Sequence, residues 1–320
     1  MADGVFVLGM HRSGTSAATR LLGLLGLRMP VDDDLVRPDE RNPTGYWESL
    51  SLVAYTNRVL WAVESDMRCP LALQPGWEAD SRLDPLRAGA PAAVAAAFGG
   101  TAWVWKDPRN CLALAFWRSA LDVSPSALLV HRNPLEIAIS AERSRRPDGK
   151  IYTLALWERY LRQALVQAEG LPMLVTRYDD LVADPVGWSA QVQGFLADSG
   201  IAVGAVSEDE AREFVDPSAR RSELTERDLL ADEDVSDAQR ALFAALERAV
   251  GRHSSFVSPS LQAETPTTEA LFGERRRALS MTRELKSHFD EEQRGRWDAR
   301  LRRSALLAPA RALYARVRSG

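Results

Sequence analysis

The stretch GVFVLGMHRSGTSAATRLLGLL, residues 4–25, decides the fold of this 320-residue chain. An apolar run over Val5–Leu8 leads into a glycine loop, and a leucine-rich helical pattern follows it. The loop almost matches the nucleotide-binding pattern G-x-x-x-x-G-K-[ST]. Gly9, Gly14 and Ser16 are in place, but Thr15 stands where that pattern has its lysine. The order of strand, glycine loop and helix predicts an anion-binding loop at the edge of a sheet.

Three further β-rich runs, each followed by a helical pattern, predict a parallel sheet that is covered on both faces. They are Ala102–Trp105, Leu128–His131 and Met173–Thr176. A long insertion separates the first two strands and predicts helices over Glu48–Val63 and Pro91–Phe98. The expected fold is therefore α/β, a P-loop-like three-layer α/β/α arrangement around a central parallel sheet.

The chain is expected to divide into an α/β domain over residues 1–252, a linker over 253–268 and a helical extension over 269–320. The linker is rich in Ser, Pro and Thr. From Glu274 onward the extension carries 13 Lys and Arg against 6 Asp and Glu, a local charge of about +7. A solvated helical hairpin is one interpretation, and weak contact with a membrane surface or a protein is the other.

Composition narrows the class of protein. The net charge of −4 gives no cationic field for nucleic acid, so no nucleic-acid partner is expected. No apolar run approaches the roughly 20 residues of a membrane span, and the first residues do not resemble a secretion signal. Cys69 and Cys111 are far apart and lack metal-ligand neighbours, which favours buried thiols in a reducing compartment. We expect a cytoplasmic protein.

The glycine loop can bind an anion without the lysine. Backbone N–H groups between Gly9 and Ser16, with the positive end of the next helix, form a cradle. Arg12 lies within the loop and supplies a cation, while Thr15 and Ser16 offer hydroxyls. His11 is expected to shape the loop or contact phosphate.

A second anion site is predicted from LLVHRNPLEIAIS, residues 128–140. Arg132 follows the strand, and Ser140 lies about two turns into the next helix, so both can reach an anion beside the first. The strand ends WKD and VHR each place a cation before any acid. We therefore expect no metal site, with Asp107 as the one alternative metal ligand.

Together these motifs resemble those of the sulfotransferases. GMHRSGTS is similar to their 5′-phosphosulfate loop, in the RSGT form of tyrosyl-protein and bacterial carbohydrate-type members, and LLVHRNPLEIAIS to their 3′-phosphate motif. WKDPR and TRYDDLVADP also resemble family segments. The resemblance spans about residues 5–198 and implies 3′-phosphoadenosine 5′-phosphosulfate (PAPS) as co-substrate, without a metal.

The resemblance also implies roles for single residues. Binding of PAPS would fall to His11, Arg12, Ser13, Gly14, Thr15, Ser16, Arg132 and Ser140. Arg220 and Arg221 stand where the family has a late basic loop, although its glycine-rich form is absent. Arg12 and Lys106 would stabilise charge that develops during sulfuryl transfer.

The general base is predicted to be Glu48. Cytosolic members place a histidine two residues after the strand-end lysine, where this chain has Pro108. Tyrosyl-protein members use a glutamate, and the stretch NPTGYWES supplies Glu48 beside two aromatic residues that can desolvate it. Asp107 and His11 remain alternatives. Tyr178 is expected to pack at its strand end.

The sequence thus predicts in-line, metal-independent transfer of a sulfuryl group from PAPS to a hydroxyl of a carbohydrate or small-molecule acceptor. Two alternatives stay open: an ATP- and Mg²⁺-dependent kinase or NTPase with a degenerate loop, and a non-catalytic nucleotide-binding scaffold. The acceptor, the residue that stacks on adenine and the oligomeric state are left open.

Overall fold

The computed structural model describes residues 4–40, 42–123, 125–144, 149–215, 223–279 and 281. The chain divides into two compact units, residues 1–269 and 270–320. In the second unit residues 270–279 and 281 are helical, and the rest of the basic extension lies outside the described residues.

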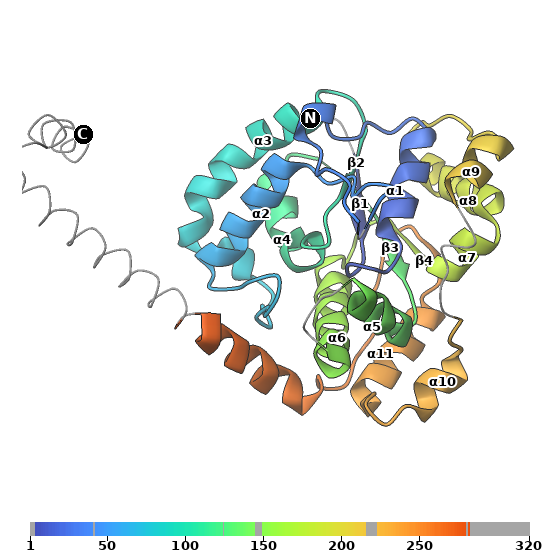
Figure 1. Cartoon of the computed structure of the whole chain (residues 1–320). Coiled ribbons are helices and arrows are strands. Elements are labelled where there is room, and N and C mark those ends of the chain that lie inside the picture. The colour runs from blue at the N-terminus through green and yellow to red at the C-terminus, as the bar shows by residue number, and fades with distance from the viewer. Residues whose placement is uncertain are drawn as a thin grey trace, which may run out of the picture. The chain divides into compact units, whose positions relative to one another are not determined.

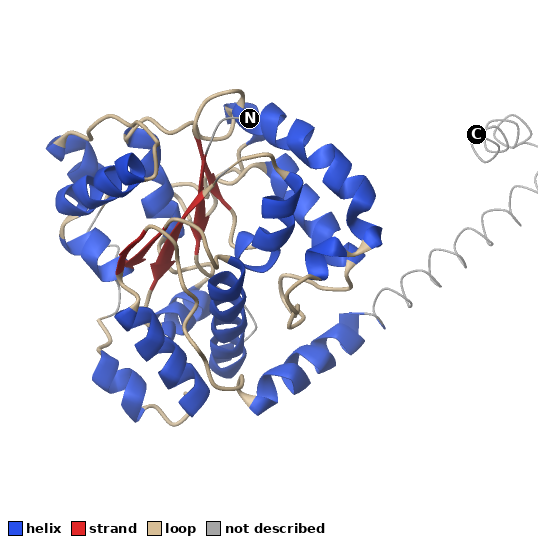
Figure 2. Ribbon diagram, turned by 180° about the vertical axis from the view of Figure 1, so that it is seen from behind, coloured by secondary structure: helices blue, strands red, loops and turns tan. Residues whose placement is uncertain are grey.

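A five-stranded sheet forms the centre of the first unit (Figures 1 and 2). Its strands are β1 Gly4–Leu8, β2 Trp103–Lys106, β3 Ser126–His131, β4 Met173–Arg177 and β5 Gly251–His253, in the order β2-β1-β3-β4-β5. The first four strands are parallel, as predicted. The short β5, which pairs antiparallel with β4, was not expected.

Helices cover both faces of the sheet (Figures 1 and 2), which confirms the predicted α/β fold. The helices are α1 Thr15–Leu24, α2 Leu50–Ala62, α3 Asp84–Phe98, α4 Asn110–Ala120, α5 Pro134–Arg143, α6 Gly149–Gln167, α7 Tyr178–Ala183, α8 Pro185–Asp198, α9 Glu208–Phe214, α10 Glu226–Ala231 and α11 Asp237–Arg248, with short 3₁₀ helices at Asp32–Asp34, Trp77–Ala79 and Ser81–Leu83. None of the helices in the described part of the chain is long and apolar enough to cross a bilayer.

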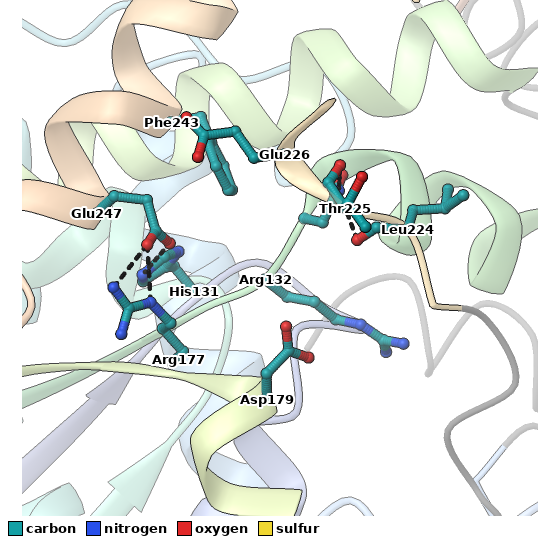
Figure 3. A pocket seen from close by; sticks show the side chains of 10 residues that line it. His131, Arg132, Arg177, Asp179, Leu224, Thr225, Glu226, Phe243 and Glu247 are labelled. Carbon is teal, nitrogen blue, oxygen red and sulfur yellow. Dashed lines mark hydrogen bonds and ion pairs between the residues drawn. The ribbon is translucent and has the colours of Figure 1, made fainter. Parts of the chain in front are cut away.

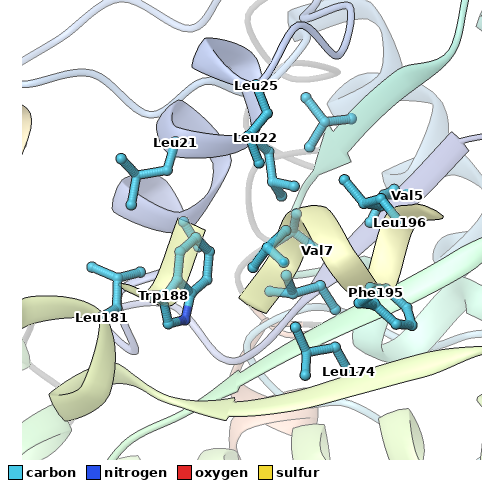
Figure 4. Close-up of a cluster of buried hydrophobic side chains, with 14 of the residues drawn as sticks. Val5, Val7, Leu21, Leu22, Leu25, Leu174, Leu181, Trp188, Phe195 and Leu196 are labelled. Atoms are coloured by element: carbon cyan, nitrogen blue, oxygen red, sulfur yellow. The ribbon is translucent and has the colours of Figure 1, made fainter. Parts of the chain in front are cut away.

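The sheet buries apolar side chains on both faces, because alternate residues of a strand point to opposite sides. Val5 and Val7 of β1 pack with α1 and α8 in one cluster, which includes Trp188 (Figure 4). Phe6 lies on the other face beside Trp105, with ring centroids 5.2 Å apart.

Two helices begin at other residues than predicted, by two positions for α2 and by seven for α3. Helix α2 begins at Leu50 rather than Glu48, because Ser49 is the N-cap and its Oγ accepts from the Leu52 N–H at 3.0 Å. Glu48 is therefore outside the helix. Helix α3 begins at Asp84, well before Pro91, since the chain has a proline at the start of that helix as well.

Residues 253–268, expected to form a linker, pack against the α/β unit. Phe256 is buried, and its backbone exchanges hydrogen bonds with Gly170 and Leu171. Further along, Glu264 pairs with the buried Arg159 of α6 at 2.7 Å, and Thr265 bonds to Glu158. Residues 253–268 therefore pack as part of the first unit.

Candidate active site

The glycine loop joins β1 to α1 and contains three residues with positive φ. Gly9 has φ 143°, Arg12 74° and Gly14 95°. A Cβ on Gly14 would lie 2.1 Å from Tyr178 Cδ2, and one on Gly9 would lie 2.6 Å from the Val130 carbonyl oxygen. Both positions therefore need glycine for space as well as for conformation.

The hydroxyls of the loop serve different purposes. Ser13 Oγ donates to the Met10 carbonyl at 2.6 Å and is buried, so it shapes the loop. Thr15 is buried at the first position of α1. Ser16 Oγ accepts from Asn42 Nδ2 at 3.3 Å, which ties the insertion to the loop. The first N–H groups of α1 have no intrahelical acceptors and can serve an anion.

The two predicted anion motifs meet in the structure. Arg12 Nε donates to Ser140 Oγ of α5 at 2.9 Å. Arg132 Nη1 donates to the Arg12 carbonyl at 3.4 Å, and the Arg132 guanidinium lies 4.3 Å from the Tyr178 ring centroid. Tyr178 thus packs at the end of β4 and covers the arginine. Two cations and a hydroxyl converge from segments that are more than 100 residues apart.

Arg132 is also held by a carboxylate that links it to a later segment. Its Nε donates to Glu136 Oε2 at 2.7 Å, while Glu136 Oε1 accepts from the Leu224 N–H at 2.9 Å. Asn133 caps α5 and donates to the carbonyls of Leu224 and Thr225. The chain is thereby anchored just after Arg220 and Arg221, which lie outside the described residues.

A pocket of about 180 Å³ opens at the ends of β3 and β4 (Figure 3). In Figure 3, Glu247 of α11 faces Arg177 and His131, and Arg132 points away from them. Glu247 pairs with Arg177 at 2.7 Å and lies 3.4 Å from His131 Nε2. Burial lowers the pKa of His131 to about 4, so its imidazole is neutral at pH 7.

Lys106 and Glu48 form a buried ion pair at the end of β2. Lys106 Nζ donates to Glu48 Oε1 at 2.5 Å and to the Tyr46 carbonyl at 3.1 Å. The exposed fractions of the two side chains are 4% and 11%. Glu48 and Lys106, two of the three predicted catalytic residues, are 58 positions apart and therefore act on each other directly.

Burial dominates the electrostatics of Glu48. Desolvation raises the pKa of its carboxyl, and the negative charge of Asp107 acts in the same direction. The charges of Lys106 and Arg109 oppose this rise. A carboxylate in such surroundings is a stronger proton acceptor than one in water.

The other two candidates for the base are placed less favourably. Asp107 is fully buried, and its Oδ1 accepts from the Arg109 backbone N–H and from Arg109 Nη1, both at 2.9 Å. His11 packs edge-on against Tyr160, with ring centroids 5.9 Å apart. No group of three His, Cys, Asp or Glu side chains suited to a metal ion occurs among the residues that the structure describes.

Sequence reasoning missed several residues of this site. Asn42 holds the insertion against Ser16, and the carbonyl of Tyr46, a residue expected only to desolvate Glu48, accepts from Lys106; a loop without periodicity gives no signal of such contacts. Cys111 accepts from the Gly9 N–H at 3.1 Å, and burial raises the pKa of its thiol to about 12. Arg109 was visible within WKDPR, yet nothing in the pattern gave it a role.

Comparisons with known proteins identify the family of the chain. Residues 4–197 match the sequence model of the sulfotransferase family. The matched span includes Arg12, Glu48, Lys106, Arg132 and Ser140, but not Arg220 or Arg221. A search of curated proteins found no match.

Solved sulfotransferase structures resemble the chain at low identity. The sulfotransferase domain of the Synechococcus PCC 7002 olefin synthase is 16% identical, with 85% of this chain and 94% of that one covered and a TM-score of 0.41. The domain from the curacin biosynthetic pathway is 14% identical, with 86% and 97% covered and a TM-score of 0.39. Sulfotransferase STF1 of Mycobacterium tuberculosis H37Rv is 20% identical, with 67% and 71% covered and a TM-score of 0.38. The sequence model of the sulfotransferase family matches more than half of this chain, so the chain belongs to the sulfotransferase family.

Proposed function

We propose that the protein transfers the sulfuryl group of PAPS to a hydroxyl of a carbohydrate or small-molecule acceptor, in line and without a metal. The observation that carries the proposal is the buried Lys106–Glu48 pair at the edge of the sheet that also holds Arg12, Ser140 and Arg132. One edge thus offers cations for a nucleotide with two anionic groups and a desolvated carboxylate for a proton.

The residues present fit such a nucleotide. At the phosphosulfate end, the positive φ of Gly14 and the start of α1 leave backbone N–H groups directed outward. At the 3′-phosphate end, Arg132 and Ser140 meet Arg12, and their mutual hydrogen bonds can be exchanged for bonds to an anion. Arg220 and Arg221 are proposed as further contacts to the 3′-phosphate, and His11, within the loop, as a residue that shapes the loop or contacts phosphate.

Each side chain would then have a distinct task. When bound, PAPS supplies an activated sulfuryl group. Arg12 and the first turn of α1 bind and orient its anionic end, while Lys106 holds a positive charge at Nζ where negative charge develops. Glu48 accepts the proton of the acceptor hydroxyl at Oε2, the oxygen that is not bonded to Lys106.

Calorimetry can test the nucleotide. We expect 3′-phosphoadenosine 5′-phosphate to bind in EDTA, and Arg132→Ala to weaken that binding at least about tenfold, or roughly 1.4 kcal/mol. Arg118→Ala serves as a matched control, because Arg118 of α4 bonds only to carbonyls of residues 167 and 169 in the contacts described. Binding of ATP alone, and only with Mg²⁺, would overturn the proposal in favour of a kinase or NTPase.

A screen with radiolabelled PAPS can test the acceptor. Sugars and small hydroxylated metabolites are offered to the wild type and to Glu48→Gln, and sulfate transfer is measured by label in the product. Labelled product from a hydroxyl compound with the wild type supports the proposal. Tight nucleotide binding without transfer to any acceptor class would instead support a non-catalytic scaffold.

A further inference from the structure

Arg109 connects three parts of the candidate site. It lies at the N-cap of α4, directly after Asp107-Pro108. Its Nε donates to Asn57 Oδ1 of α2 at 2.8 Å, and its Nη1 donates to Asp107 Oδ1 at 2.9 Å. The same Nη1 lies 3.9 Å from Glu48 Oε2. Asn57 Oδ1 and Asp107 Oδ1 thereby fix the guanidinium, which faces Oε2 of Glu48, the oxygen that Lys106 does not bond.

The surroundings of Glu48 contain two buried cations and two buried anions. The side chains of Lys106, Glu48, Asp107 and Arg109 are between 0% and 12% exposed. Charges in such a place need partners, because transfer out of water is costly. In the structure Lys106 neutralises Glu48 at Oε1, and Arg109 faces Oε2 while bonded to Asp107.

This balance changes during the proposed reaction. Lys106 Nζ has three N–H bonds, of which two go to Glu48 Oε1 and the Tyr46 carbonyl, so the third can meet negative charge on a bound donor. The donor then shares the positive charge that neutralises Glu48, and Glu48 depends more on Arg109 against the negative charge of Asp107. Without that cation a buried carboxyl takes up a proton, and a protonated Glu48 cannot act as a base.

We infer that Arg109 is a positioning residue that keeps Glu48 ionised and its Oε2 in place while Lys106 serves the donor. This inference rests on the proposed function for its catalytic consequence, although its electrostatic part concerns the protein alone. Asn57 then has the role of aiming the guanidinium from α2.

The other titratable groups around Glu48 support this assignment. Burial is the largest cause of the raised pKa of Glu48. The charge of Lys106 lowers this pKa, the charge of Asp107 raises it further, and the charge of Arg109 lowers it. Tyr46, on the loop of Glu48, has its ring 5.9 Å from Lys106 Nζ. Tyr160 of α6 interacts with Arg109 and carries His11 against its ring. Arg109 is the cation whose bonds do not depend on the donor.

The test is a ¹³C NMR titration of glutamate carboxyl carbons in the full-length protein without donor. The Glu48 signal is identified by its loss in Glu48→Gln. We expect Arg109→Gln to raise the pKa of Glu48 by about one unit, a tenfold change in its protonation equilibrium. In Arg109→Lys, which keeps the positive charge, the pKa of Glu48 should lie close to its wild-type value. Arg118→Ala, on the same helix, should leave the titration of Glu48 as in the wild type.

Asn57→Ala provides a second route, because it keeps the charge and releases its orientation. We expect the pKa of Glu48 to rise in this variant too, by less than in Arg109→Gln. An unchanged titration in Arg109→Gln overturns the inference. Should that variant fail to fold, an unchanged titration in Asn57→Ala overturns it.

The pH dependence of sulfate transfer gives the catalytic part of the test. The acid limb of the profile should move to higher pH in Arg109→Gln and return in Arg109→Lys, whereas a merely structural role would lower the rate at every pH alike. A wild type that transfers no sulfate would defeat the proposed function, and the NMR titration would still decide whether Arg109 controls Glu48.

Discussion

At the scale of single residues, Glu48 and Lys106 share one desolvated site, so a change in either alters the chemistry of the other. We expect Glu48→Gln and Lys106→Ala each to slow sulfate transfer at least about tenfold, or roughly 1.4 kcal/mol. Single-turnover transfer from labelled PAPS measures this. Lys150→Ala is the control, since Lys150 pairs with Asp232 and Asp234 and is one-third exposed. Unchanged turnover in a variant would remove that residue from its role.

The same pair has a consequence for stability. Lys106→Ala leaves the Glu48 carboxylate buried without its closest cation, and losses of this kind cost about 3–5 kcal/mol of unfolding free energy. Glu48→Gln with Lys106→Met removes both charges, and we expect it to unfold at a higher urea concentration than Lys106→Ala. Equal midpoints for the single and double variants would show that the pair is not held as a buried ion pair.

His131 predicts a specific loss of stability in acid. Its pKa is about 4 in the folded protein against 6.5 in the unfolded chain, so between these pH values the unfolded state binds more protons. Stability contributed by the neutral imidazole is therefore present above pH 6.5 and is lost as pH falls to about 4, by roughly 3 kcal/mol. Urea unfolding of wild type and His131→Leu at both pH values should show this difference. Parallel pH dependences would contradict it.

At the scale of elements, the start of α1 depends on Gly14. Ala at this position places a Cβ 2.1 Å from Tyr178 Cδ2 and has to adopt the positive φ of Gly14, so we expect Gly14→Ala to lose nucleotide binding and about 1–3 kcal/mol of stability. Gly170→Ala is the matched control, because Gly170 has φ 79° and no atom within 4 Å of the added Cβ. Calorimetry and thermal unfolding measure both effects. Similar losses in the two variants would show that contact with Tyr178 is unimportant.

The sequence predicts some of the strands and contacts between elements but not others. The parallel strands were predictable because each is a buried apolar run between turns, whereas β5, with three partly exposed residues, has no such pattern. The meeting of Arg12 with Ser140 followed from parallel strands whose ends share an edge. The contact of Arg109 with Asn57 joins helix α2 of the insertion to the start of α4, and it depends on packing between distant segments that no local pattern encodes.

At the scale of the whole molecule, the end of the α/β unit can be tested by truncation. A chain cut after residue 252 loses Glu264 and Thr265, which leaves Arg159 and Glu158 of α6 with fewer partners although both are buried. We expect it to be less stable than a chain cut after residue 269 by at least about 3 kcal/mol. Urea unfolding of the two chains measures the difference.

Arg159→Met separates this cause from the general loss of chain. In the chain cut after residue 252, the substitution removes a charge that has lost both of its carboxylates, Glu264 and Glu269, so it should stabilise the fold. In the chain cut after residue 269, it breaks the pairs with these two carboxylates, so it should destabilise the fold. Effects of the same sign in both chains would mean that residues 253–269 act only through apolar contacts such as Phe256, and that the ion pair is not what fixes the end of the unit.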